Sequence, residues 1–123
     1  MDSQAIRLYE NHQSNQQDKQ IFHGMGDFGG LDLVMYRPES DCMKPAVLKS
    51  DVVGLLPCES YQGSGVYLVM VRGIDEPILR RVARSPKGLH LICDNELYQS
   101  DITKPDDVAF LGRVKRLYHL HEL

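Results

Sequence analysis

The centre of the chain carries two neighbouring stretches, Asp41-Cys42-Met43-Lys44-Pro45 and Ser50-Asp51-Val52-Val53-Gly54-Leu55-Leu56-Pro57. The first places a thiol just before a Met-x-Pro sequence, and the second is an apolar run that a proline stops. Such a run is typical of a strand, because β-branched residues fit a pleated sheet and proline cannot donate to its ladder. We therefore expect a strand over 51–56, preceded by a loop or a single helical turn over 38–46.

Further strand patterns lie on both sides of this pair, separated by turns rich in glycine and proline. They cover residues 31–37, 66–71, 78–84, 89–93 and 108–120. No stretch shows a sustained helical period, so the sequence predicts a mostly β protein, folded as a compact antiparallel β structure with short helical turns. We expect this domain to cover residues 31–123. Residues 1–30 are polar, end in a glycine-rich loop and are expected to form a linker or N-terminal arm, in which 3–11 could make a short helix.

Length, charge and cysteine usage limit the kind of protein. A chain of 123 residues is one domain long, and its net charge of -3 argues against a nucleic-acid binder, because phosphate binding needs a basic face. The three cysteines, Cys42, Cys58 and Cys93, match neither a secreted disulfide framework nor a zinc-site spacing. We expect no metal and no cofactor, and we read His119-x-His121 as a solvated tail. With no membrane-spanning run and no signal-peptide pattern, the expected location is the cytoplasm, without membrane contact.

Several motifs in this order resemble the peptidase S24 family, the LexA-like C-terminal domain of SOS and phage repressors. Asp41-Cys42-Met43-Lys44-Pro45 looks like the family's nucleophile motif G-D-S-M-x-P, and Ser50-Asp51-Val52-Val53 looks like its G-D-x-V. Gly65-Val66-Tyr67-Leu68-Val69 looks like G-x-Y-x-V, and Ile78-Leu79-Arg80-Arg81-Val82 looks like the strand that carries the family's catalytic lysine.

Two later motifs complete the resemblance, which covers residues 31–118. Cys93-Asp94-Asn95 with Tyr98 looks like S-D-N-x-x-Y, and Leu111-Gly112-Arg113-Val114 looks like I-x-G-R-V. The resemblance implies the β fold that LexA shares with signal peptidases.

The family's chemistry is self-cleavage, in which a serine hydroxyl attacks a peptide bond of the protein's own linker and a neutral lysine takes the proton. Here the resemblance puts Cys42 in the serine's place and Arg80 in the lysine's place. A cysteine thiolate could attack, but arginine stays protonated and cannot act as the base. The Ala-Gly or Cys-Gly bond that the family usually cuts is also absent before Cys42. We therefore expect a protein that has kept the fold and lost the catalysis.

The resemblance also implies the surroundings of the former dyad. The residues expected to line its cleft are Asp41, Met43, Pro45 and Asp51. Arg80 is expected to pair with a carboxylate such as Asp41 or Asp51. The cleft could still bind a peptide segment by β-pairing, since the family presents its own linker there as a strand.

The function that the resemblance implies is that of the oligomerisation and regulatory C-terminal domain of a phage- or prophage-type transcriptional repressor. Its expected partners are a second copy or a higher homo-oligomer, an antirepressor protein, and DNA only through an N-terminal helix-turn-helix domain that this chain lacks. The chain is then a fragment of a longer repressor or a stand-alone relative. The residues expected at the dimer surface are Phe110, Val114, Leu117 and Tyr118.

Two alternatives stay open. The first is an S24-type autopeptidase in which Cys42 is an altered nucleophile and Arg80⁺ lowers its pKa. The second is a stand-alone protein-interaction module, for example one that occupies the cleft or dimer surface of a related repressor.

Overall fold

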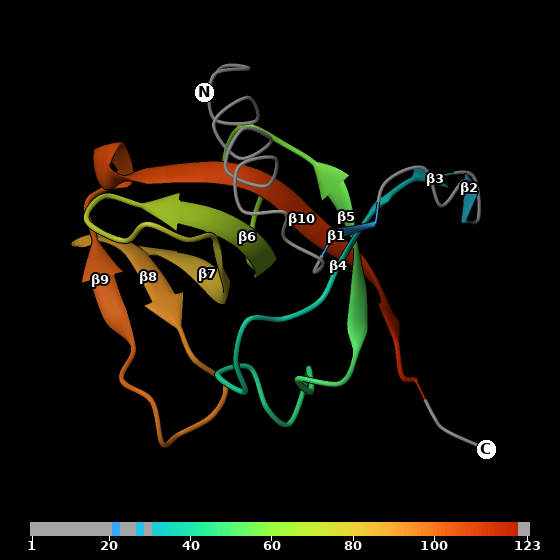
Figure 1. Cartoon of the computed structure of the whole chain (residues 1–123). Coiled ribbons are helices and arrows are strands. Elements are labelled where there is room, and N and C mark those ends of the chain that lie inside the picture. The colour runs from blue at the N-terminus through green and yellow to red at the C-terminus, as the bar shows by residue number, and fades with distance from the viewer. Residues whose placement is uncertain (1–20, 23–26, 29–30, 121–123) are drawn as a thin grey trace.

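The computed structural model describes residues 21–22, 27–28 and 31–120 (Figure 1). In this part of the chain the regular structure is almost entirely strand. The strands are β1 (Ile21–Phe22), β2 (Asp27–Phe28), β3 (Leu31–Asp32), β4 (Val34–Tyr36), β5 (Val52–Pro57), β6 (Gly65–Val71), β7 (Ile78–Ser85), β8 (Gly88–Ile92), β9 (Asp101–Thr103) and β10 (Val108–Tyr118), and a single 3₁₀ turn, η1 (Pro105–Asp107), precedes β10. All their pairings are antiparallel, so the predicted mostly β antiparallel fold is confirmed. Within these residues we find no helix long and apolar enough to cross a membrane.

The longest strand, β10, joins the two halves of the sheet. Eight strands follow the order β1-β4-β5-β10-β6-β7-β8-β9, and β2 and β3 form a separate pair. The first half of β10 pairs with β6, and its second half pairs with β5. The register shifts between Phe110 and Gly112 on the β6 side and between Val114 and Arg116 on the β5 side. Such bulges increase twist and bend a strand, in keeping with the long curved course of β10 in Figure 1.

The strands expected from the sequence recur with small changes of boundary. The strand expected over 31–37 is interrupted at Leu33, which separates β3 from β4. The segment 94–107, expected to be a polar loop throughout, contains β9 and η1. Two residues of the expected arm, Ile21 and Phe22, also contribute, because β1 pairs with β4, with Ile21 opposite Tyr36. The short helix expected over 3–11 lies outside the described residues.

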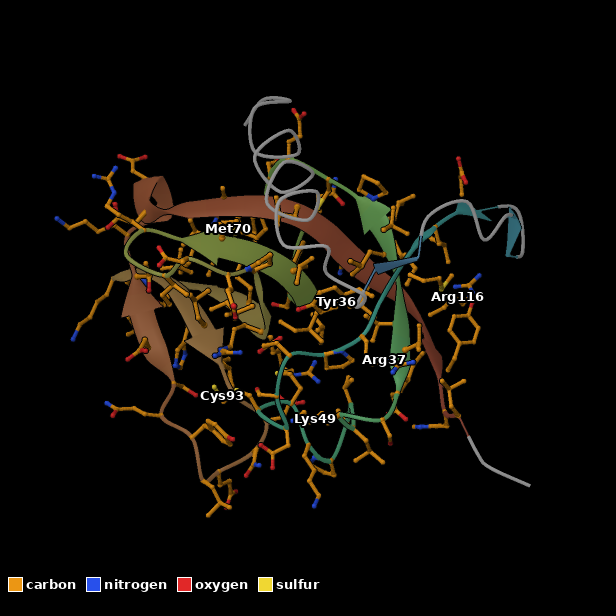
Figure 2. All side chains as sticks on the ribbon, viewed as in Figure 1. Tyr36, Arg37, Lys49, Met70, Cys93 and Arg116 are labelled. Carbon is orange, nitrogen blue, oxygen red and sulfur yellow. The ribbon has the colours of Figure 1, made fainter. Side chains whose placement is uncertain are left out.

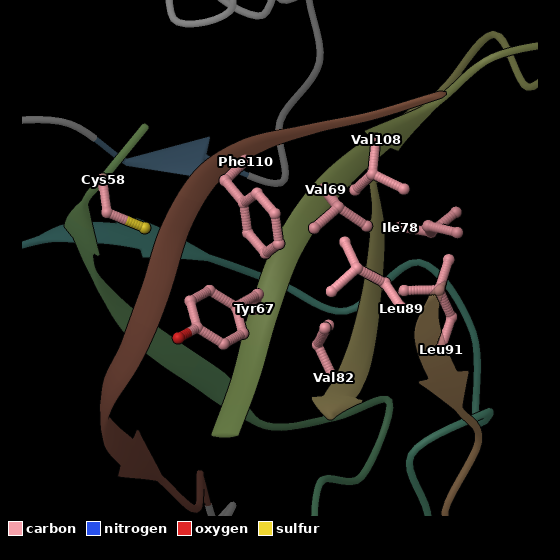
Figure 3. Packing of buried hydrophobic residues seen from close by; sticks show 9 residues of the cluster. All are labelled: Cys58, Tyr67, Val69, Ile78, Val82, Leu89, Leu91, Val108 and Phe110. Carbon is pink, nitrogen blue, oxygen red and sulfur yellow. The ribbon is translucent and has the colours of Figure 1, made fainter. Parts of the chain in front are cut away.

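The core divides into clusters on the two faces of β6. Leu68 of β6 belongs to a first core cluster, whose buried members are Tyr36, Met43, Val47, Val53, Leu55, Leu68, Leu79 and Leu111. Its sequence neighbours in β6 belong to a second core cluster, shown in Figure 3, whose members are Cys58, Tyr67, Val69, Ile78, Val82, Leu89, Leu91, Val108 and Phe110. Because successive residues of a strand point to opposite faces, a strand buried on both faces is apolar throughout. This explains the continuous apolar run of β6.

Tyr67 of the second core cluster also anchors the loop before β6. Its ring packs edge-on against Phe110 at a centroid distance of 5.0 Å, and its hydroxyl donates to the Gly63 carbonyl at 2.7 Å. The Arg113 guanidinium lies 5.4 Å from the same ring and donates to the carbonyls of Gln62 and Ser64, each at 2.8 Å. The arginine of the Leu111-Gly112-Arg113-Val114 motif therefore holds a loop in place.

The turn between β7 and β8 offers a test of how tightly the sheet is built. Gly88 has a φ of +139°, and a Cβ there would lie 2.7 Å from the Thr103 carbonyl oxygen of β9. Gly73 has a φ of +90° but open space around it. We expect Gly73→Ala to cost about 1–2 kcal/mol through backbone strain alone, and Gly88→Ala to cost about 3 kcal/mol or more because strain and collision add. Urea unfolding measures both, and equal losses would contradict the close approach.

Candidate functional site

The loop that carries Cys42 lies between β4 and β5, and we call residues 38–50 the Cys42 loop. Met43 and Val47 are 2% and 4% exposed and fasten this loop to the first core cluster. The Val47 amide donates to the Met43 carbonyl at 2.9 Å, and the Lys44 amide donates to the Asp41 carbonyl at 3.1 Å. The segment expected to be a loop or a single helical turn is therefore a hydrogen-bonded turn within a loop. Its packing leaves the Cys42 side chain only 1% exposed.

A second loop, residues 93–100 between β8 and β9, lies against the Cys42 loop, and we call it the Cys93 loop. The Asn95 amide donates to the Cys42 carbonyl at 2.9 Å, and the Asn95 side-chain amide donates to the Asp41 carbonyl at 3.1 Å. The Tyr98 hydroxyl donates to the Asp41 carboxylate. Figure 2 shows Cys93 on the same side of the molecule as the segment that runs from Arg37 to Lys49. Asn95 and Tyr98 of the Cys93-Asp94-Asn95 and Tyr98 motif thus hold the peptide groups on both sides of Cys42 and the Asp41 side chain.

Arg80 of β7 pairs with Glu39 of the Cys42 loop. Its Nη1 is 3.4 Å from the Glu39 carboxylate and donates to the Leu79 carbonyl at 2.7 Å. Glu39 also accepts hydrogen bonds from the Tyr36 hydroxyl and the Leu79 amide, each at 3.3 Å. Both side chains of the pair are less than one-fifth exposed, so the pair is largely shielded from water.

The prediction that Arg80 pairs with Asp41 or Asp51 is therefore wrong. Each of these aspartates binds another side chain. Asp41 accepts from Tyr98. Asp51 is 1% exposed, accepts from the Leu48 amide at 2.8 Å and lies 2.9 Å from Nδ1 of His119. His119 is accordingly bound to the end of the Cys42 loop and is not simply part of a solvated tail.

A family model described as Peptidase S24-like matches residues 9–115 of the chain. The chain belongs to the peptidase S24-like family. A comparison with curated proteins finds no match.

Cys42 carries a thiol whose surroundings oppose ionisation. Burial, followed by a hydrogen bond with Cys93, raises the pKa of the Cys42 thiol to about 12, and the opposing charge of Arg80 does not outweigh them. At pH 7 such a thiol is a thiolate in only about one molecule in 10⁵. The structure thus brings Cys42 and Arg80 together, yet it does not produce the ion pair that would activate the thiol.

The other residues expected in the cleft or at the dimer surface range from exposed to buried. Pro45 is exposed at the tip of the Cys42 loop and follows a cis peptide bond. Phe110 is 5% exposed and packs in the second core cluster, while Val114 and Tyr118 are half-buried against other core clusters. Leu117, at 37% exposure, is the member of the expected dimer surface with the most accessible side chain. The dimer surface itself stays a prediction.

Glu39 is the functional residue that sequence reasoning missed. It precedes Cys42 by only three positions and faces a strand with two adjacent arginines, Arg80 and Arg81. Arg81 pairs with a different carboxylate, Asp94 of the Cys93 loop, through two hydrogen bonds of 2.7 and 2.8 Å. A search for acidic residues that could balance these two arginines would have drawn attention to Glu39.

The raised pKa of Cys42 predicts a pH-dependent contribution to stability. The folded protein holds the thiol proton more tightly than the unfolded chain, whose thiol has the ordinary pKa of about 9. This contribution is fully present below about pH 9 and is lost as the pH rises toward 12. We expect the difference in unfolding free energy between wild type and Cys42→Ser to shrink from pH 8 to pH 11.

Urea unfolding at several pH values measures that difference. Gly73→Ala is the control, because the substitution adds or removes no titrating group and its cost should not change with pH. A constant difference between wild type and Cys42→Ser across this range would contradict the buried, protonated thiol.

Proposed function

We propose that this S24-like domain is the oligomerisation and regulatory domain of a phage- or prophage-type transcriptional repressor, acts in the cytoplasm, and has lost self-cleavage. The observation that supports the proposal is the ion pair between Arg80 and Glu39, because the resemblance assigns Arg80 to the place of the family's catalytic lysine. A general base must offer a free lone pair, and a guanidinium offers only donors.

The other candidates for a base support the same conclusion. Lys44 and Lys49 are exposed residues of the Cys42 loop and do not lie on β7, where the family has its lysine. The Glu39 carboxylate is engaged by Arg80, Tyr36 and the Leu79 amide. With the Cys42 thiol protonated at neutral pH, neither half of a proton-transfer dyad is in its reactive form.

A domain without self-cleavage retains a simple role in repression. Pairing two protomers places two DNA-reading domains on one assembly, and bivalence raises affinity for a two-half-site operator without any new contact to DNA. In this proposal DNA is bound through a separate helix-turn-helix domain. Release from DNA then depends on another protein, such as an antirepressor that binds this domain, instead of on cleavage.

Incubation of the chain under reducing conditions at pH 7 and pH 10, followed by intact-mass measurement, tests the loss of cleavage. We expect the wild type and Cys42→Ala to stay intact at both pH values. A family member that keeps its serine and lysine serves as the positive control and should be cut faster at pH 10, where its base is neutral. A fragment that forms from the wild type and not from Cys42→Ala would establish Cys42 as a working nucleophile and refute the proposal.

Sedimentation velocity at high micromolar concentration tests the oligomerisation. We expect the wild type to sediment as a dimer or larger, and Leu117→Glu to sediment as a monomer because it places a charge on the exposed part of β10. Ile74→Glu is the matched control, since Ile74 is similarly exposed, at 44%, in the turn after β6. A monomeric wild type would count against the oligomerisation role, and dissociation by both variants alike would count against the β10 surface.

A further inference from the structure

We propose that Cys42 and Cys93 are a dithiol modification site, which a hydroperoxide oxidises to an intramolecular disulfide and a thiol reductant restores. The two residues are 51 positions apart in sequence and come from different loops. The inference concerns the chemistry of the site and holds whether or not the domain acts in repression.

The first support is the contact between the two side chains. The Cys93 side chain is close enough to the Cys42 thiol to raise its pKa through a hydrogen bond and through charge, and the Cys93 thiol also donates to the Gln99 carbonyl at 3.6 Å. Cys42 is 1% exposed and Cys93 is 8% exposed, so both sulfur atoms lie within the protein and neither faces open solvent. Cys58 is also buried, but it packs in the second core cluster and is not among the groups that act on Cys42.

The second support is that the backbone on both sides of the pair is already fixed. The hydrogen bonds from Asn95 to the carbonyls of Cys42 and Asp41 bring the Cys42 loop against the segment just after Cys93. The Cys93 amide is in turn bonded to the Ser100 hydroxyl at 3.0 Å. A disulfide needs two Cα atoms a few ångströms apart with side chains directed at each other. Two loops in direct hydrogen-bond contact, with Cys93 two residues before the Asn95 that binds the Cys42 carbonyl, bring the two cysteines near each other.

The reaction balances with the peroxide as the only oxidant. One sulfur, that of the more exposed Cys93, attacks a peroxide oxygen and becomes a sulfenic acid, with release of water when the oxidant is hydrogen peroxide. The Cys42 sulfur then attacks the sulfenic sulfur, a second water leaves, and the S–S bond forms. Two thiols and one hydrogen peroxide thus give one disulfide and two waters, and two electrons pass from sulfur to oxygen.

The surroundings also determine how the site responds. Oxidation requires a thiolate, and burial together with the shared hydrogen bond keeps Cys42 protonated. The pair is therefore slow and remains reduced under ordinary intracellular conditions. Sustained exposure to oxidant converts the two thiols to a disulfide. A covalent bond then joins the Cys42 loop to the Cys93 loop, in addition to the hydrogen bonds that Asn95 and Tyr98 make between them.

The test treats the fully reduced chain with increasing hydrogen peroxide, unfolds it, alkylates the remaining thiols with N-ethylmaleimide and measures intact mass and peptides. We expect a species that has lost two hydrogens, carries a single alkyl group at Cys58 and contains a peptide cross-link between Cys42 and Cys93. Dithiothreitol should return it to the triply alkylated form. The cross-linked form should unfold at higher urea concentration than the reduced form.

Three serine variants complete the test. Cys58→Ser should still form the cross-link, while Cys42→Ser and Cys93→Ser should not, and circular dichroism establishes that each is folded. If a variant fails to fold, the peptide map of the oxidised wild type still shows whether Cys42 and Cys93 are cross-linked. The proposal is overturned if peroxide produces only sulfinic acids, links either residue to Cys58 or to another molecule, or leaves all three thiols unchanged.

Discussion

The pairing of β10 with both β5 and β6 is the constraint on which the rest of the structure depends. This eleven-residue strand pairs with β6 along its first half and with β5 along its second half, and its register shifts once against each neighbour. Because β6 then lies in the middle of the sheet with both faces covered, the first core cluster forms on one face and the second on the other. The Cys42 loop rests on the first of these, so the position of the candidate site follows from the course of β10.

At that site, the charged side chains form two ion pairs. Arg80 and Glu39 neutralise each other in a shielded place, while Arg81, whose side chain is 42% exposed, pairs with Asp94 of the Cys93 loop. Removing one member of a shielded pair leaves an uncompensated charge, which costs far more than the pair contributes. Arg80 is thereby tied to Glu39, and a lysine in its place would put its amine beside a carboxylate that favours the charged form of the amine.

The strands were predictable where burial imposes a pattern, and the site was predictable only in part. β5, β6, β7 and β8 were found because buried strands need apolar, β-branched residues. β9 was missed because it is exposed and its polar residues need follow no pattern. Alternation along β10 alone does not reveal that Phe110, assigned to the dimer surface from the resemblance, packs in the second core cluster. The partner of Arg80 depends on which acid the folded loop presents, which sequence order alone does not determine.

The strand β9 has a consequence for how copies of this protein can meet. It is the last strand in the order of the eight-stranded sheet, only three residues long, and it begins with an exposed aspartate, Asp101. After Lys104 come Pro105 and two more acids in η1, Asp106 and Asp107, of which Asp107 pairs with Arg72. Short strands, prolines and like charges at a sheet edge discourage other strands from adding to it. Open-ended growth of sheets through this edge, the first step toward fibrous aggregates, is thereby disfavoured.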